Sequence, residues 1–470
     1  MPALALLCTA QFMLILDVTV VNVALPSIQP DLGFAFGDLQ WVVTAYTLAF
    51  GGLLLLGGRA ADLLGRRRVF LAGLGVFTVA CLASALAPSP EALIASRALQ
   101  GVGAAMLSPA ALSLITAIFP EGPERHRALA AWAAVAASGG AVGVLVGGAL
   151  TEAFGWESIF LINVPVGIVA ALAALRVLPS VPPAAGGRID VAGGLIATAS
   201  LMALIYGLVD SDSAGWGSLH TMGLFALAAA GIVAFVTIEA RVKDPLVALS
   251  VFRSRPTITA LVLLILGMGA LFSGFFFFSS LYLQEVLGHS ALRTGLEFLP
   301  VAVAIAAAAH GGGHLVARFG AKPVIATGLA LGAGGALLLS GLSAHGSYAT
   351  DILPGFLVLG VGGGLSASGV MITAMSGASH ENAGLVSGLT TTGHELGIAL
   401  VLSVLSTIAA SQIGGGGLET AAGADPTLLT AGFADAFRVA SAIALGATLL
   451  ALVALRREDV APGAKPAFAH

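Results

Sequence analysis

Asp17 is an acidic residue in the middle of the first long apolar segment of the chain, residues 3–26. A charged side chain at the centre of a membrane-spanning helix costs roughly 2.5–3.5 kcal/mol on insertion scales. Such a carboxyl group can hold a proton when it is dry and release it when water reaches it. We therefore predict proton exchange at Asp17. A protonated, hydrogen-bonded structural residue is the alternative.

Arg97 is the one basic residue well inside an apolar segment, residues 92–118. A guanidinium group does not readily lose its proton, so it needs a carboxylate, carbonyl groups or water around it. Asp17 is the partner that we predict. The alternative is that Arg97 only ties helices together.

His394 and Glu395 are adjacent titratable residues in the segment 384–410, which is otherwise apolar or small. We predict that this pair exchanges protons or binds a cationic substrate, with a structural hydrogen bond as the alternative. Glu297, near one end of the segment 294–316, is a further candidate. The sequence has no metal-ligand spacing and no phosphate-binding loop, so we expect no metal and no cofactor.

Aromatic residues crowd the segment 257–286, where Phe275, Phe278 and Tyr282 share one helical face. Most such stripes pack against other helices or lipid. The functional alternative, which we predict, is that these side chains line a cavity for flat, apolar or cationic molecules.

The composition indicates that membrane helices position these residues. Hydrophobic residues make up 58% of the 470 residues and charged residues only 9%, whereas soluble proteins have roughly 25% charged residues. This excludes an ordinary soluble enzyme, a disordered protein and a nucleic-acid binder. The 62 glycines suit membrane helices that pack closely.

Fourteen apolar segments have the length of about 20 residues that a membrane-spanning helix needs. The predicted spans are 3–26, 39–58, 69–87, 92–118, 128–151, 159–177, 191–210, 220–240, 257–286, 294–316, 322–343, 352–375, 384–410 and 434–455.

The basic residues orient these spans. With a cytoplasmic N-terminus, all basic residues except Arg97, Arg293 and Arg438 fall in cytoplasmic segments, as the positive-inside rule requires. No basic residue precedes Arg59, so we expect the first segment to stay as a span and not to be a cleaved signal peptide. The sequence predicts a multi-pass protein of the cell membrane with both termini in the cytoplasm.

Two predicted cytoplasmic loops, residues 57–67 and 312–322, repeat the same spacing of glycines and basic residues. The repeat predicts two six-helix halves, residues 1–180 and 251–470, with two additional helices in residues 181–250. Transporters built from such repeats bind their substrate between the halves, near the membrane midplane.

The first of these loops resembles the cytoplasmic signature G-x-L-A-D-x-x-G-R-[RK] of the major facilitator superfamily. Residues 16–26, 97–103 and 160–167 resemble motifs of its fourteen-helix drug:proton antiporters. The resemblance implies the major facilitator fold, an all-α membrane protein. It also adds Asn22, Gln100 and Asn163, which stand in these motifs, as candidate cavity residues. Val144 replaces the usual proline of the fifth-span motif, but Gly139, Gly143 and Gly147 keep a face of small residues.

The first loop also carries a predicted mechanical role. Asp62 can cap a neighbouring helix and accept hydrogen bonds from arginines, which would latch the cytoplasmic side shut. The alternative is that the loop only orients the chain through its positive charge. The predicted latch consists of Gly58, Asp62, Gly65, Arg66, Arg67 and Arg68.

These observations predict proton-driven efflux of lipophilic small molecules, a drug or a self-made metabolite, by alternating access. The expected partners are the cargo, protons and membrane lipids, and we expect a monomer. A proton symporter that imports a nutrient is the first alternative. A membrane enzyme or lipid-handling protein is disfavoured, because the loops are short and no metal cluster is present, so we expect no enzyme activity.

Overall fold

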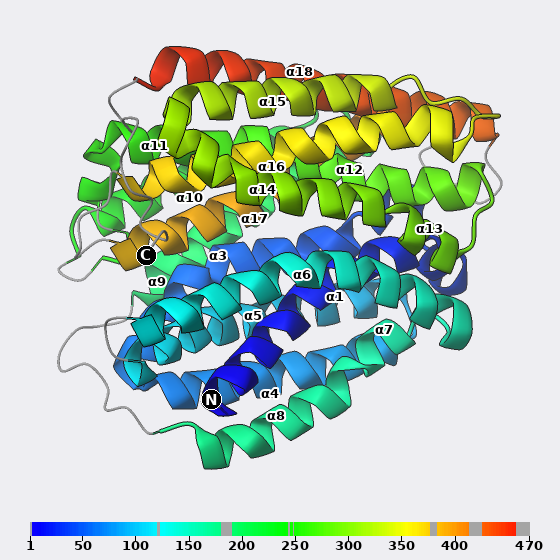
Figure 1. Ribbon diagram of the computed structural model, residues 1–470. Helices are drawn as coiled ribbons and strands as arrows, with labels where there is room; N and C mark the ends of the chain where they lie inside the picture. Colours follow the sequence, from blue (N-terminus) through cyan, green and yellow to red (C-terminus); the bar gives the residue numbers. More distant parts are fainter. Residues whose placement is uncertain are drawn as a thin grey trace.

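A computed structural model describes residues 2–119, 123–179, 190–242, 245–247, 249–376, 383–412 and 425–456. Within these ranges the regular structure is helical throughout (Figure 1). Thirteen helices in these ranges are long and apolar enough to cross a membrane. The prediction of an all-α membrane protein is therefore confirmed.

The first group of helices covers the N-terminal part of the chain. Its members are α1 (Pro2–Leu32), α2 (Phe36–Leu39), α3 (Trp41–Leu64), α4 (Arg66–Ala85), α5 (Pro90–Ile118), α6 (Pro123–Phe154), α7 (Ser158–Leu161) and α8 (Asn163–Val177). Two further helices follow, α9 (Val191–Ala214) and α10 (Leu219–Glu239).

The second group covers the C-terminal part and includes short 3-10 and π-helical stretches. Its members are η1 (Leu249–Arg253), α11 (Arg255–Val262), η2 (Leu263–Met268), α12 (Gly269–Leu281), η3 (Tyr282–Val286), α13 (Ala291–Glu297), α14 (Leu299–Phe319), α15 (Ala321–Leu339), η4 (Tyr348–Ile352), α16 (Leu353–Ser376), α17 (Ala383–Ser411) and α18 (Pro426–Ala454).

The observed helices differ from the predicted spans at several ends. The predicted span 128–151 lies within α6, of which Val142–Phe154 forms a shorter apolar stretch, so the count of fourteen stays a prediction. Helix α1 continues past residue 26 to Leu32, and α18 begins at Pro426 instead of residue 434. Arg438 thus lies inside α18, where an ion pair with Asp435 one turn earlier lets both charges remain in the helix.

The two groups lie one above the other in Figure 1, with α1–α8 below and α11–α18 above. The additional helix α9 packs against both α3 and α17, which belong to different groups. Helix α10 packs against α9 and is the least buried of the membrane-crossing helices. The two additional helices are therefore attached at the seam between the groups.

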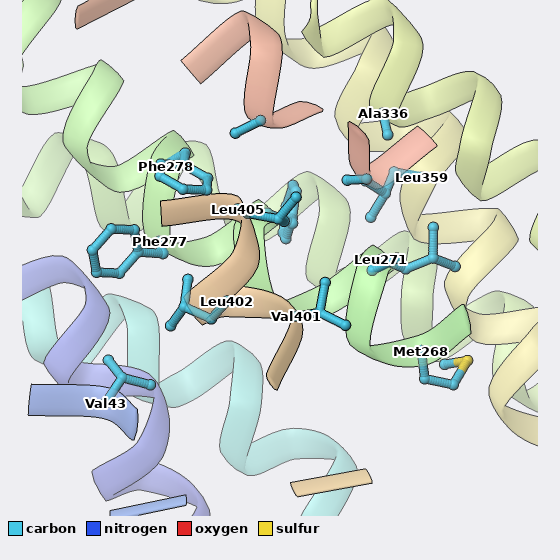
Figure 2. Packing of buried hydrophobic residues seen from close by; sticks show 14 of the residues in the cluster. Val43, Met268, Leu271, Phe277, Phe278, Ala336, Leu359, Val401, Leu402 and Leu405 are labelled. Atoms are coloured by element: carbon cyan, nitrogen blue, oxygen red, sulfur yellow. The ribbon is translucent and has the colours of Figure 1, made fainter. Parts of the chain in front are cut away.

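The C-terminal group has a core of large apolar side chains. Figure 2 shows Phe277 and Phe278 of α12 beside Leu402 and Leu405 of α17. All four side chains are at most 1% exposed. Packing of this density fixes the relative positions of the helices that carry Glu395 and the aromatic stripe.

Glycines bring α6 into close contact with α1. A Cβ atom added at Gly139 would lie 2.8 Å from Ile15, and one at Gly147 would lie 2.8 Å from the Cα atom of Val20. Gly143 is pressed in the same way against Thr19. The predicted small-residue face is confirmed. Helix α6 runs unbroken through Val144, the position of the missing proline.

A second close contact joins the two groups at the α6–α13 junction. A Cβ atom added at Gly295 of α13 would lie 2.7 Å from the carbonyl oxygen of Val144, and Gly148 is packed as tightly against the backbone of Ala291. Oε2 of Glu152 accepts a hydrogen bond from the backbone N–H of Leu292 at 3.0 Å. Residues far apart in the sequence thus connect the two groups at this end.

Candidate functional site

Three buried polar side chains from α5 and α8 meet around the carboxylate of Asp17 on α1. Its Oδ2 lies 2.6 Å from Nη1 of Arg97, and its Oδ1 accepts from Nε2 of Gln100 at 2.6 Å. Asn163 donates to the same Oδ1 at 3.5 Å. Each of these side chains is at most 1% exposed. The predicted pairing of Asp17 with Arg97 is confirmed, and we call these four residues the Asp17 centre.

The guanidinium group of Arg97 is satisfied on several sides. Its Nε donates to the carbonyl oxygen of Val42 at 2.9 Å, and Nη1 donates to Oε1 of Gln100 at 2.7 Å. Its Cζ lies 4.5 Å from the ring centroid of Tyr46 and 5.6 Å from that of Phe160. A buried charge persists only when it is paired and hydrogen-bonded, and this arrangement meets both conditions.

Local sequence explains how the centre assembles. Arg97 and Gln100 are three residues apart and therefore share a face of α5. One residue later, Gly101 lets α5 approach α3, because an added Cβ atom would lie 2.5 Å from the carbonyl oxygen of Tyr46. This approach brings Val42 and Tyr46 to the guanidinium group.

The geometry suits the ionised form of Asp17. Both carboxylate oxygens accept hydrogen bonds from donors on other helices, and a permanent positive charge lies against one of them. A proton on Asp17 would remove the negative charge and leave Arg97 without its counter-ion.

Sequence reasoning missed Tyr46 and Cys81. Tyr46 is fully buried under Arg97, and Gln100 donates to Sγ of Cys81 at 3.0 Å. A signal for Tyr46 existed, since it is a hydroxyl-bearing aromatic residue within the apolar segment 39–58. Its contact with Arg97 depends on how α3 and α5 pack, which the sequence does not display.

His394 and Glu395 lie on α17, across α3 from the Asp17 centre. His394 Nδ1 is 3.7 Å from Glu395 Oε1, and the Glu395 side chain is 12% exposed whereas that of His394 is 37% exposed. Oε2 of Glu395 is buried without a hydrogen-bond partner among the described residues. Helix α3, which carries Tyr46, passes close to this pair, because a Cβ atom added at Gly51 would lie 2.8 Å from the Cβ atom of Glu395.

Several other predicted site residues lie elsewhere. The amide of Asn22 donates to the carbonyl oxygen of Val18 within its own helix, at 3.0 Å. Glu297 bonds to His289 at 2.8 Å and to Arg293 at 3.1 Å, beside the α6–α13 junction. Neither contact belongs to the Asp17 centre.

The aromatic stripe lies in the core of the C-terminal group, and the predicted role of its side chains in lining a cavity stays a prediction. Phe275 contacts Phe356 edge-on at 4.7 Å between ring centroids, and Phe278 lies 5.5 Å from Phe433. Tyr282 is buried and donates to the carbonyl oxygen of Ser343 at 2.6 Å. Packing between helices accounts for all three side chains.

The predicted latch residues surround the turn between α3 and α4. Gly65 has a φ of 100°, a backbone conformation that favours glycine, and Gly58 lies near Pro109 of α5. Asp62 pairs with Arg66 at 3.6 Å, with both side chains partly exposed.

Two arginines of the same turn reach other helices, while Arg68 is exposed. Arg66 donates to the carbonyl oxygen of Ser113 at 3.2 Å, and Arg67 donates to that of Leu175. These bonds hold the turn on α5 and α8. In the described ranges, no group of three or more His, Cys, Asp or Glu residues could hold a metal ion.

Comparison with known proteins identifies the family. The family model described as Major Facilitator Superfamily matches residues 7–402. The chain is 43% identical to a cephamycin export protein of Amycolatopsis lactamdurans, over 89% of this chain and 87% of that protein. It is 38% identical to a puromycin resistance protein of Streptomyces alboniger, over 96% of this chain and 89% of that protein.

Solved structures agree on the fold. An auto-inhibited peptide transporter of the POT family superposes with a TM-score of 0.69 at 16% identity, covering 99% of both chains. The human organic anion transporter MFSD10 superposes with a TM-score of 0.60 at 17% identity, covering 96% of this chain and 99% of the other. The fold and the family model agree with the motifs around Asp17 and Arg97, and the chain belongs to the Major Facilitator Superfamily.

Proposed function

We propose that the protein is a proton-driven exporter of lipophilic small molecules that works by alternating access as a monomer in the cell membrane. The observation that carries the proposal is the buried Asp17–Arg97 pair. When a deeply buried acid is held by one arginine, binding or release of a proton by the acid can drive a movement of the helices that carry the two residues. Export is favoured over import by the relatives, whose names describe export of, or resistance to, antibiotics.

The proposed cargo class follows from the same relatives and from the membrane setting. Cephamycin, puromycin and tetracenomycin C appear in the names of three of them. We therefore propose an antibiotic, or a metabolite that the cell makes itself, as the cargo. The peptide transporters among the similar structures are only 16% identical, so they support the fold and not a peptide cargo.

In the proposed cycle, Asp17 alternates between two states. When it is ionised, its hydrogen bonds with Arg97, Gln100 and Asn163 hold α1, α5 and α8 together. When it is protonated, the attraction weakens and the N-terminal group can change its position relative to the C-terminal group. Glu395 and His394 are the proposed second titratable site, on helix α17, which packs against α3.

The proposed cycle also needs a closed end and an open end. We infer that the α6–α13 junction is the closed outer end, because it connects residues that the charge pattern assigns to the external side. The termini and the turn of the latch then face the cytoplasm.

The proposal is tested by transport into everted membrane vesicles that contain the protein. With an imposed pH gradient, an antibiotic such as puromycin should accumulate inside, and a protonophore should abolish the accumulation. Accumulation that persists without a proton gradient would exclude proton drive. Loss of a preloaded compound in place of uptake would support the symporter alternative.

A further inference from the structure

Asp190 and Glu239 place two carboxylates together at one end of the additional helices, far along the chain from the Asp17 centre. Asp190 caps α9, and its Oδ1 accepts from the backbone N–H of Gly193 at 2.8 Å. Glu239 is the last residue of α10 and is only 3% exposed; its Oε2 accepts from the backbone N–H of Val247 at 3.0 Å. Each carboxylate is thus fixed through one of its oxygens.

The second oxygens of the two carboxylates share one small space beside Gly193. A Cβ atom added at Gly193 would lie 2.5 Å from Oδ2 of Asp190 and 3.0 Å from Oε1 of Glu239. Both oxygens are buried, and neither has a hydrogen-bond partner in the part of the chain that the structure describes. A buried acceptor without a partner is costly, and two ionised carboxylates at such a distance repel one another.

Within the described residues, no basic side chain donates a hydrogen bond to either of these oxygens. Arg241 follows α10 and is exposed.

Helix α3 also approaches this end of α9. A Cβ atom added at Gly194 would lie 3.3 Å from the side chain of Leu56, and Arg59 follows Leu56 on α3 after almost one turn. Arg59 has an interaction of its own and makes no hydrogen bond to the two free oxygens.

We propose that Asp190 and Glu239 form a proton-binding site in which Oδ2 of Asp190 and Oε1 of Glu239 share a single proton. The shared proton removes one charge and turns two facing acceptors into a donor and an acceptor. Its loss leaves two negative charges in a buried space. The site would then hold the ends of α9 and α10 together only while it is protonated. This proton-binding site is independent of the direction of transport and of Asp17.

Reaction with dicyclohexylcarbodiimide tests proton occupancy directly, because this apolar reagent modifies protonated carboxyl groups in apolar surroundings. The full-length protein in lipid nanodiscs is treated over a range of pH and mapped by peptide mass spectrometry. We expect modification at Asp190 or Glu239 that is high at mildly acidic pH. Above the midpoint it should fall about tenfold per pH unit, as for one titrating group.

Substitutions add a stability test. In Glu239→Gln, the amide oxygen can still accept from Val247, and the amide N–H₂ can donate to Asp190, so the variant imitates the protonated pair. The shared proton stabilises the wild-type fold, so its melting temperature should fall as the pH rises through the midpoint, whereas that of Glu239→Gln should stay constant. Glu91→Gln, an exposed carboxylate on α5, is the matched control and should behave as the wild type.

Two results would overturn the proposal. The first is a pair of findings: carbodiimide modification does not vary with pH, and the melting temperatures of wild type and Glu239→Gln depend on pH in the same way. Together they would mean that the pair stays ionised. The second is protection of the carboxylates by Na⁺, K⁺, Mg²⁺ or Ca²⁺ at constant ionic strength, which assigns the space to a metal cation. Labelling of the wild type decides the question even if a variant does not fold.

Discussion

Nη1 of Arg97 lies 2.6 Å from Oδ2 of Asp17, although 80 residues separate them in the sequence. Both side chains are at most 1% exposed, so water does not screen their attraction. Gln100 donates to the second oxygen of Asp17. Removal of either charge would leave the other buried without its counter-ion.

Asp17→Asn should abolish transport driven by a pH gradient and leave binding of the cargo. Asparagine imitates the protonated acid and cannot release a proton, so occupancy by proton and cargo can no longer be linked. The measurement is gradient-driven transport in proteoliposomes, with cargo binding to the same purified protein. Glu91→Gln, which changes an exposed carboxylate on α5, is the control and should transport normally. Full gradient-driven transport by Asp17→Asn would move the coupling role to Glu395.

Arg97→Lys should keep the charge of Arg97 but lose most transport activity. A lysine side chain cannot bond Asp17, Gln100 and Val42 at once, nor lie flat on the Tyr46 ring as a planar guanidinium does. Loss of one charge-assisted bond costs about 1.5–3 kcal/mol. Transport by the reconstituted variant should therefore fall roughly tenfold to hundredfold. Activity equal to the wild type would reduce the role of Arg97 to that of a point charge.

Glu395→Gln should alter the pH dependence of transport more than His394→Ala does. Glu395 is nearly buried with one oxygen unpartnered among the described residues, whereas His394 is 37% exposed. Transport rates across a pH series in proteoliposomes would show the difference. A larger change in His394→Ala would assign the second titratable role to the histidine.

Glu152→Ala should weaken the closed α6–α13 junction. The substitution removes the acceptor of the hydrogen bond from Leu292, while the glycine packing of α6 against α13 stays. A cysteine placed at position 292 should then react faster with a membrane-impermeant maleimide in intact cells. Glu157→Ala is the matched control, since Glu157 lies on the same side of the protein beside Gly155. Equal rates in both variants would show that the glycines alone close the junction.

The topology is tested by single cysteines in a background with Cys8 and Cys81 replaced by alanine. A cysteine at position 212, between the predicted seventh and eighth spans, should react with an impermeant reagent in intact cells. One at position 243, after the eighth span, should react only after permeabilisation. The reverse pattern would contradict the cytoplasmic assignment of the termini, which depends on the basic residues.

The sequence by itself determined the class of protein, the positions of the helices and the presence of Asp17 and Arg97 within them. The reason is that a bilayer imposes a simple rule: about 20 consecutive apolar residues form a span, and every charge inside a span must find a partner. That rule predicts that Arg97 needs a carboxylate, carbonyl groups or water around it, and it makes Asp17 a candidate partner. The glycine spacing in 139–147 likewise predicts close packing of α6, because only small residues let helix backbones approach.

Only the tertiary structure decided which of the other polar and aromatic residues meet. Asn163 joined Asp17, while Asn22, in the same helix as Asp17, bonded to its own backbone. Phe275 and Phe278 share a helical face, yet that face turned toward the core of the C-terminal group. The periodicity of one helix tells which side chains lie together, but not which neighbour that face meets. Contacts such as Tyr46 on Arg97 and Asp190 beside Glu239 depend on the packing of several helices at once. At Gly101, for example, close approach of α5 to the backbone of Tyr46 sets the position of the ring.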